Sequence, residues 1–164
     1  AMFSTIRAKE AFWSQIKSCN YLQNVLMKKE CLEKGFDFAI CKDESGRLTE
    51  GSTENLLLVT RERDVVVPKF DYTLRGTTVL EVMKIAEELV VRGDVRKVIL
   101  ADVREEDLLS AAEAAFVGTT LGVLPVTRIG QKPVGSGKVG SVAAFLHHRL
   151  MEKMSADPEL RTPF

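Results

Sequence analysis

Hydrophobic residues recur along the chain with two different spacings, and these predict a mixture of helices and short strands. Residues 55–59 form an almost unbroken apolar run, which is typical of a strand buried on both faces of a sheet. Between residues 74 and 93 the apolar residues recur at every third or fourth position, which predicts an amphipathic helix. Thr78 and Glu81 have the spacing of a capping box at its start, and Gly93 is expected to end it.

The remaining predicted elements follow from the same two patterns. A short helix ending near residue 110 is expected to begin with a second capping box, formed by Asp102 and Glu105, and a final helix is expected over residues 140–154. Helices and strands are mixed without strict alternation, so the pattern predicts one compact α+β domain over residues 1–164. Short apolar runs predict further strands at residues 36–41, 65–67, 97–101, 113–117 and 123–129.

One more helix is predicted shortly after residue 17. Ser18 or Asn20 is expected to cap it, and Gly35 is a natural stop. The side expected to be buried is marked by its apolar residues: Leu22, Val25, Leu26, Cys31 and Leu32.

Length and composition are those of an ordinary globular protein. The 164 residues are 45% hydrophobic and 28% charged, which suffices for a sizeable core in a single domain. The formal net charge is zero and no segment concentrates Lys and Arg, so nothing favours nucleic acid or an anionic membrane as a partner. The longest apolar runs are far too short to span a bilayer. Three widely spaced cysteines form no metal-ligand pattern, so no metal is expected and a reduced, cytoplasmic protein is the simplest interpretation.

Two short stretches supply three groups with complementary chemistry. Residues 16–22 contain an amine on Lys17 and a phenol on Tyr21, and residues 48–56 contain a carboxylate on Glu50. A lysine amine can form a Schiff base with the aldehyde of pyridoxal 5′-phosphate, and a phenol can hydrogen-bond the oxygen on its ring. A carboxylate can keep the pyridine nitrogen protonated, so that the ring accepts electrons. The pairing and order of the two stretches therefore suggest a pyridoxal phosphate site.

The same stretches resemble the motifs of a known family. The resemblance is carried by KSCNYL at residues 17–22 and TEGST at residues 49–53, which are similar to the lysine and glutamate motifs of the class IV pyridoxal-phosphate enzymes. That family includes D-amino-acid aminotransferases, branched-chain aminotransferases and aminodeoxychorismate lyases. The resemblance extends from about Lys17 to Leu150 and covers only the C-terminal large domain, without the smaller N-terminal domain. It implies an α+β pseudo-barrel of mixed strands with flanking helices.

The resemblance also implies a role for individual side chains. Lys17 is expected to be the Schiff-base lysine and proton shuttle, with a solvated surface lysine as the alternative. Tyr21, at position i+4 on the predicted helix, is expected to bind the cofactor's phenolate oxygen, although a half-buried core tyrosine has the same pattern. Glu50 is the expected partner of the pyridine nitrogen, with a surface acid as the alternative and Glu54 close enough to be confused with it. Leu74 occupies the position that packs against the cofactor ring, or is an ordinary core residue.

Two Gly-Thr-Thr turns, at residues 76–78 and 118–120, are expected to bind the phosphate. Such a turn alone would usually be only a helix cap, but two in this order match the family's pattern. The second would add hydroxyl donors from Thr119 and Thr120. The first lies near the start of the predicted helix and would offer backbone N–H groups of three residues: Gly76, Thr77 and Thr78.

The implied reaction is pyridoxal-phosphate-dependent transamination between an amino acid and a 2-oxo acid, and residues 16–27 look most like the D-amino-acid branch. The same cofactor site would also serve elimination of the aminodeoxychorismate lyase type. Because the resemblance lacks the N-terminal domain, a third interpretation is a truncated, catalytically incomplete half-enzyme or an assembly module. A homodimer is expected in every case, since the missing domain would leave apolar surface exposed. A separately encoded N-terminal half is the other expected partner.

Overall fold

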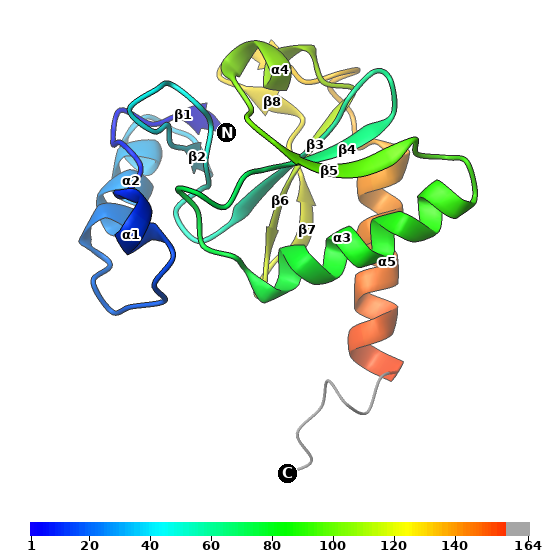
Figure 1. Cartoon of the computed structure of the whole chain (residues 1–164). Helices are drawn as coiled ribbons and strands as arrows, with labels where there is room; N and C mark the ends of the chain where they lie inside the picture. Colours follow the sequence, from blue (N-terminus) through cyan, green and yellow to red (C-terminus); the bar gives the residue numbers. More distant parts are fainter. Residues whose placement is uncertain (157–164) are drawn as a thin grey trace.

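The computed structural model describes residues 1–156 and is built around one five-stranded sheet (Figure 1). Only β4 and β5 run parallel and the other neighbouring strands are antiparallel, so the sheet is mixed. The expected single domain over residues 1–164 extends beyond the described residues. The strand order is β5-β4-β3-β6-β7, formed by Lys97–Ala101, Asp64–Pro68, Asn55–Val59, Glu113–Gly118 and Gly122–Pro125.

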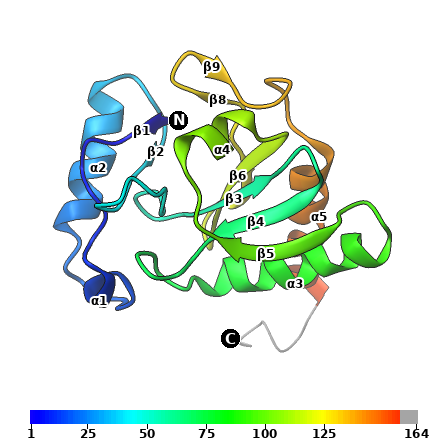
Figure 2. The same cartoon turned by 45° about the horizontal axis from the view of Figure 1, so that its top comes forward.

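Each face of the sheet is covered by different elements (Figure 2). On one face Leu57 and Val59 of β3 pack with α3 and α5, while on the other Leu56 and Leu58 pack with α4 and the β8–β9 hairpin. This explains why all five residues of β3 are buried, as their apolar run predicts. The covering elements are α3 (Thr77–Val91), α4 (Glu105–Ser110), β8 (Arg128–Ile129), β9 (Lys132–Pro133) and α5 (Ser141–Ala156).

The N-terminal segment lies beside the sheet and has a small core of its own (Figures 1 and 2). Its two short strands pair in parallel and α2 packs against them. This core consists of Met2, Met27, Cys31, Ala39 and Cys41. The segment comprises β1 (Met2–Phe3), α1 (Ala11–Ser14), α2 (Leu22–Glu33) and β2 (Ala39–Ile40).

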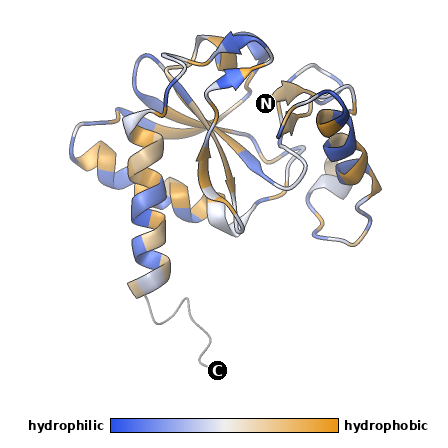
Figure 3. Cartoon of the chain, turned by 180° about the vertical axis from the view of Figure 1, so that it is seen from behind, coloured by the Kyte–Doolittle hydropathy of each residue, from blue (hydrophilic) through white to orange (hydrophobic). Residues whose placement is uncertain are grey.

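The buried side of α2 differs from the predicted one. Met27 and Cys31 are buried together with the polar Asn24, and these three positions form a single stripe along the helix. Of the residues expected inside, only Cys31 is buried, because the small core of this segment offers contacts to one narrow stripe. Four large apolar side chains point outward instead: Leu22 (65% exposed), Val25 (53%), Leu26 (42%) and Leu32 (58%). Figure 3 shows hydrophilic and hydrophobic residues intermixed along α2, whereas the central strands of the sheet are mostly hydrophobic.

Both predicted capping boxes are wrong. Gly76 is the N-cap of α3 and makes no side-chain cap, and the Thr78 hydroxyl instead lies 3.1 Å from that of Thr119, which comes from a distant turn. At α4 the backbone N–H of Arg104 donates to Asp107 at 2.7 Å, while Asp102 forms ion pairs elsewhere. Thr78 and Asp102, which the local spacing predicted to cap helices, therefore interact instead with residues that are distant in the sequence.

Two predicted strands are shorter than expected. The segment 36–41 contributes only β2, and the segment 123–129 divides into β7 and β8. Pro125 lies at the division, where a proline cannot donate a hydrogen bond to a neighbouring strand. No helix among residues 1–156 is long and apolar enough to cross a membrane.

Candidate active site

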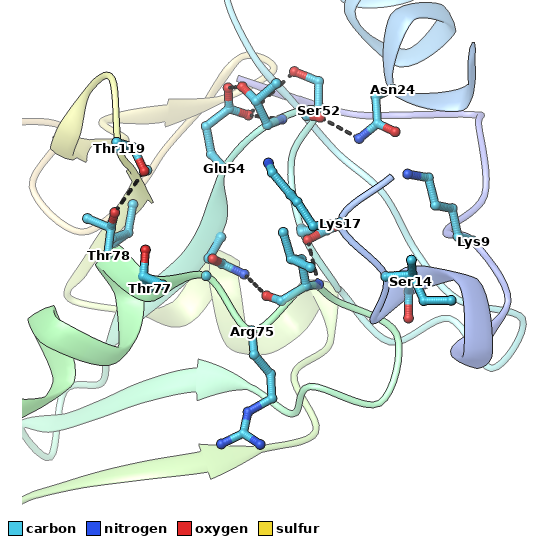
Figure 4. A pocket seen from close by; sticks show the side chains of 18 of the residues that line it. Lys9, Ser14, Lys17, Asn24, Ser52, Glu54, Arg75, Thr77, Thr78 and Thr119 are labelled. Atoms are coloured by element: carbon cyan, nitrogen blue, oxygen red, sulfur yellow. Dashed lines mark hydrogen bonds between the residues drawn. The ribbon is translucent and has the colours of Figure 1, made fainter. Parts of the chain in front are cut away.

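A cavity of about 280 Å³ lies where the N-terminal segment meets the ends of the interior strands β3 and β6 (Figure 4). Its walls come from residues 9–24 on one side, and from residues 50–55, 74–78 and 117–119 on the other. The volume is close to the lower end of the range of about 300–1,000 Å³ that is common for ligand pockets. Eight of the nine predicted site residues line the cavity, and Thr120 does not.

Lys17 and Tyr21 reach the cavity from the N-terminal side. Lys17 lies in the loop between α1 and α2, and among residues 1–156 it has no hydrogen-bond or ion-pair partner. Tyr21 directly precedes α2 and is 36% exposed. The two would share one face of a helix only if that helix began near Lys17, and α2 begins at Leu22. The lysine amine therefore lies on a loop and forms no hydrogen bond or ion pair with the described residues.

Glu50 reaches the cavity from the opposite side. It pairs with Asn55 in an isolated β-bridge, and one carboxylate oxygen accepts a hydrogen bond from the backbone N–H of Leu74 at 3.0 Å. Burial raises the pKa of Glu50 to about 7; the Leu74 hydrogen bond and the Lys9 charge oppose this rise, and Glu54 adds to it. The carboxyl therefore gains or loses its proton near neutral pH, and a cationic neighbour would favour the charged form.

A second acid, Glu54, lines the same cavity, although the sequence motif assigned a cofactor-binding role only to Glu50. It is 5% exposed, and its carboxylate accepts hydrogen bonds from the backbone N–H of Thr53 at 3.0 Å and from the hydroxyls of Thr53 and Ser52. Burial raises the pKa of Tyr21, and the charges of Glu54 and Glu50 raise it further. The phenol is thus kept in its protonated form, ready to donate.

The two Gly-Thr-Thr turns meet at the far end of the cavity. Thr78 in the first turn of α3 contacts Thr119 through their hydroxyl oxygens, 3.1 Å apart, across 41 positions of the chain. Backbone N–H groups in the first turn of a helix have no partner within the helix, and they carry its positive dipole end. This end of the cavity therefore offers donors to an anion.

Close packing holds the first turn in place. The Asn55 side chain donates to the backbone carbonyl of Leu74 at 2.8 Å, and Gly76 lies so close that a Cβ atom there would overlap the Asn55 side-chain oxygen. The glycine is therefore required by space alone, because its φ of -61° is open to any residue. Neither Asn55 nor its contact with Gly76 is marked by a local motif.

Two further residues of the cavity carry no sequence signal. Asn24 donates to the backbone carbonyl of Ser52 at 2.5 Å, but its buried side-chain oxygen has no hydrogen-bond partner among the described residues. A buried acceptor without a partner is costly unless a ligand or water satisfies it. Lys9, which precedes α1, also lines the cavity and lies over the ring of Tyr21, with its ammonium 5.6 Å from the ring centroid.

The described part of the chain offers little for a metal. Residues 1–156 contain no group of three or more His, Cys, Asp or Glu side chains that could hold a metal ion. All three cysteines are free, with Cys19 exposed and Cys31 and Cys41 buried.

Comparison with known proteins gives consistent matches. The family model described as "Amino-transferase class IV" matches residues 3–129. The chain is 35% identical over 158 residues to the chloroplastic D-amino-acid transaminase of Arabidopsis thaliana, covering 94% of this chain and 42% of that protein. It is 31% identical over 157 residues to the D-alanine aminotransferase of Bacillus licheniformis, covering 94% and 53%.

Solved structures match over the same region. The T.th. branched-chain amino acid aminotransferase, complexed with N-(5'-phosphopyridoxyl)-L-glutamate, superposes with a TM-score of 0.88 at 29% identity, over 97% of this chain and 53% of that one. The Escherichia coli branched-chain amino acid aminotransferase gives 0.82 at 27% identity, over 96% and 51%. These matches confirm the predicted α+β fold with mixed strands and flanking helices. The chain spans about half the length of the proteins that it matches.

Proposed function

The chain belongs to the class IV aminotransferase family, and from this premise we propose that its cavity carries out pyridoxal-phosphate-dependent amino transfer between an amino acid and a 2-oxo acid. One observation carries the proposal. A single cavity gathers an uncommitted lysine, a protonated phenol, a carboxyl poised near neutral pH and a helix N-terminus. Since the matched proteins are about twice as long, the activity of this chain by itself is part of the proposal.

The cofactor is pyridoxal 5′-phosphate. Two structures of the T.th. relative contain derivatives of it, N-(5'-phosphopyridoxyl)-L-glutamate and pyridoxamine 5'-phosphate. When bound, the cofactor supplies an aldehyde for the amine and a ring that accepts electrons. The donor set of the cavity fits it: an amine, a carboxyl and a group of anion-binding N–H donors are present in one space.

Lys17 is the proposed point of covalent attachment and the group that moves the proton. Its freedom from ion pairs leaves the amine available for reaction, and its position in a loop lets it withdraw and return. The Lys17 amine, when not bonded to the cofactor, would lie within the same cavity, where it could take a proton from a bound substrate and give it back. The proton would be held on the Lys17 Nζ atom between these events.

Glu50 and Tyr21 are proposed to set the electronic state of the cofactor ring. The Leu74 N–H orients the Glu50 carboxylate, and a pyridinium beside it would pull its pKa down from about 7 and hold it charged. Tyr21, whose raised pKa keeps its proton in place, donates to the ring oxygen. Leu74, which lines the cavity, is proposed to pack against the ring.

The phosphate is proposed to bind where the two Gly-Thr-Thr turns meet. The N–H groups of Thr77 and Thr78 and the dipole of α3 would hold the anion, whereas the N–H of Gly76 already donates to the backbone carbonyl of Leu74 at 2.9 Å. Thr119, in contact with Thr78, adds a hydroxyl donor. Because Thr120 does not line the cavity, the proposal for this second turn rests on Thr119.

The test is to label the attachment site. The purified chain is mixed with pyridoxal phosphate, its visible spectrum is recorded, and borohydride reduction is followed by peptide mapping. We expect an absorption band of the lysine-bound cofactor and a label on Lys17, both lost in Lys17→Arg and retained in Lys9→Arg. No band, or a label on Lys9 in place of Lys17, contradicts the assignment.

We also propose that the chain assembles, as a homodimer or with a separately encoded N-terminal half. The observation behind this is the apolar surface formed by α1, α2 and the loop between them, including Phe12 (68% exposed), Trp13 (58%) and Leu22 (65%). A surface of this kind is typical of protein interfaces. Light scattering of the purified chain tests it, and a strictly monomeric chain that nevertheless binds cofactor would contradict the homodimer.

A further inference from the structure

The cavity holds a second lysine that the proposed cofactor chemistry does not use. Lys9 lies in the segment before α1 and lines the same cavity as Lys17, Tyr21 and Glu50. Figure 4 shows Lys9 on one side of Lys17, with the hydroxyls of Thr78 and Thr119 on the other. Lys9 is therefore placed away from the end of the cavity that would hold the phosphate.

The Lys9 ammonium is not engaged in an ion pair. Within residues 1–156 the ammonium makes no hydrogen bond or ion pair; it lies 5.6 Å from the centroid of the Tyr21 ring, and its charge lowers the pKa of Glu50 from a greater distance. Other lysines of the chain are committed, such as Lys42 with Glu105 and Lys69 with Asp102. A partly buried ammonium beside a cavity, with no carboxylate at ion-pair distance, is suited to bind an anion that comes from outside.

The substrates of the proposed reaction supply such an anion, because every amino acid and 2-oxo acid carries a carboxylate. Three cationic side chains line the cavity: Lys9, Lys17 and Arg75. Lys17 is assigned to the cofactor. Arg75 extends away from the cavity in Figure 4, and its guanidinium lies 5.8 Å from the ring of Phe70. Lys9 is therefore the cation left for the substrate.

A neighbouring hollow decides on which side of Lys9 the carboxylate lies. This hollow adjoins the cavity, since Lys9, Ile16 and Ser18 line both. The hollow contains the carboxylates of Glu10 and Glu44, and Lys9 is the one cationic side chain among the residues that line it. The cavity also contains two carboxylates, those of Glu50 and Glu54, but there Lys17 adds a second positive charge, and burial keeps part of the Glu50 population protonated near neutral pH. An anion bound by Lys9 should therefore lie on the cavity side, near Tyr21 and Lys17.

We propose that Lys9 binds the carboxylate of the amino acid or 2-oxo acid substrate, on the side of Lys17 opposite Thr78 and Thr119. This residue-level assignment rests on the proposed function, because the identity of the anion as a substrate follows from the reaction. Lys9 would orient the substrate so that its amino or oxo carbon, next to the carboxylate, faces Lys17. It is a binding residue and takes no part in proton movement.

The experiment measures carboxylate binding without cofactor, so that it does not depend on turnover. The probe is 4-methylvaleric acid, which was bound in a structure of the T.th. relative. Its dissociation constant is measured by ligand-observed NMR on the full chain carrying Lys17→Met, which removes the competing ammonium. The series adds Lys9→Met, Lys9→Arg and, as a matched control, Lys132→Met on the distant strand β9.

Lys9→Met should weaken 4-methylvalerate binding about tenfold, which corresponds to about 1.4 kcal/mol. Lys9→Arg should stay within about twofold of the parent, and Lys132→Met should change nothing. Uncharged 4-methylpentanol should bind the Lys9→Met and parent chains equally. Equal carboxylate affinity in the parent and in Lys9→Met, or no saturable binding to the parent, overturns the proposal. Either result leaves the borohydride label on Lys17 unaffected, so this failure is distinguishable from failure of the proposed function.

Discussion

The two walls of the cavity are built in different ways. The sheet-side wall, formed by residues 50–55, 74–78 and 117–119, contains buried side chains that are tied together by hydrogen bonds. The N-terminal wall, formed by residues 9–24, consists mostly of exposed loop and carries its lysines without ion pairs. Glu50 and the first Gly-Thr-Thr turn, which need a fixed position, therefore come from the sheet side, and Lys17, which needs freedom to move, comes from the N-terminal side. Substitutions in the two walls should then affect different properties.

The largest effect is expected from Lys17→Met, which should lower the rate of the reaction but leave the stability of the fold almost unchanged. Removing a group that forms the covalent bond and moves the proton should lower the rate of amino transfer by about 10⁴-fold or more, which is about 5.5 kcal/mol. The free energy of unfolding should change by less than about 0.5 kcal/mol, because the side chain is exposed and makes no ion pair. Single-turnover absorbance and urea unfolding measure the two quantities. A large loss of stability would contradict the description of this wall.

The corrected face of α2 gives the next prediction, through two neighbouring residues. Met27 is 3% exposed and Leu26 is 42% exposed. Met27→Ala should lower the free energy of unfolding by about 2–4 kcal/mol because it leaves a cavity in a small core. Leu26→Ala is the matched control and should cost less than about 0.5 kcal/mol. Urea unfolding of both variants measures the free energy of unfolding. Equal losses would contradict the buried side of α2 seen in the structure and support the side predicted from the sequence pattern.

The difference between α2 and β3 shows where sequence patterns suffice. The bounds of β3 follow from its own residues, since an apolar run that packs on both faces needs no knowledge of its neighbours. Which side of α2 is buried depends on β1 and β2, which lie before and after it in the chain. The positions of the apolar residues within α2 therefore did not predict its buried side. The caps failed for a related reason: Thr78 is taken by Thr119, which no local spacing reveals.

The candidate site divides in the same way. Lys17, Tyr21 and Glu50 could be found because each sits in a motif with its own chemistry. Lys9 and Asn24 could not, because only the folded chain brings them to the cavity and neither belongs to a motif. The helix spacing used to relate Lys17 to Tyr21 was wrong although both residues line the cavity, because a loop places them there.

The sheet-side wall should make stability depend on pH through Glu50. Burial raises its pKa from an ordinary value of 4.5 to about 7, so the folded chain holds this proton more tightly than the unfolded one. The resulting contribution is present below about pH 4.5 and is lost as the pH rises through about 7, a change on the order of 2–3 kcal/mol. Glu50→Gln should remove it, while exposed Glu62→Gln should not. Urea unfolding of the cofactor-free chain at pH 5 and pH 8 measures the difference, and an unchanged pH dependence in Glu50→Gln would contradict the raised pKa of Glu50.

Two glycines at the phosphate end of the cavity give the smallest expected effect and compare the turns directly. In Gly76→Ala the new methyl group would collide with the Asn55 side chain, which would have to give up its hydrogen bond to Leu74. This should cost about 1–2 kcal/mol of stability and weaken pyridoxal phosphate binding. In Gly118→Ala the nearest atom, the Thr53 carbonyl oxygen, lies 3.5 Å away, which is ordinary contact. Because it adds a methyl group without a clash, Gly118→Ala should leave both stability and cofactor affinity unchanged. Equal losses of stability and affinity in the two variants would contradict the prediction and show that both turns are equally crowded. Urea unfolding and cofactor titration distinguish these outcomes.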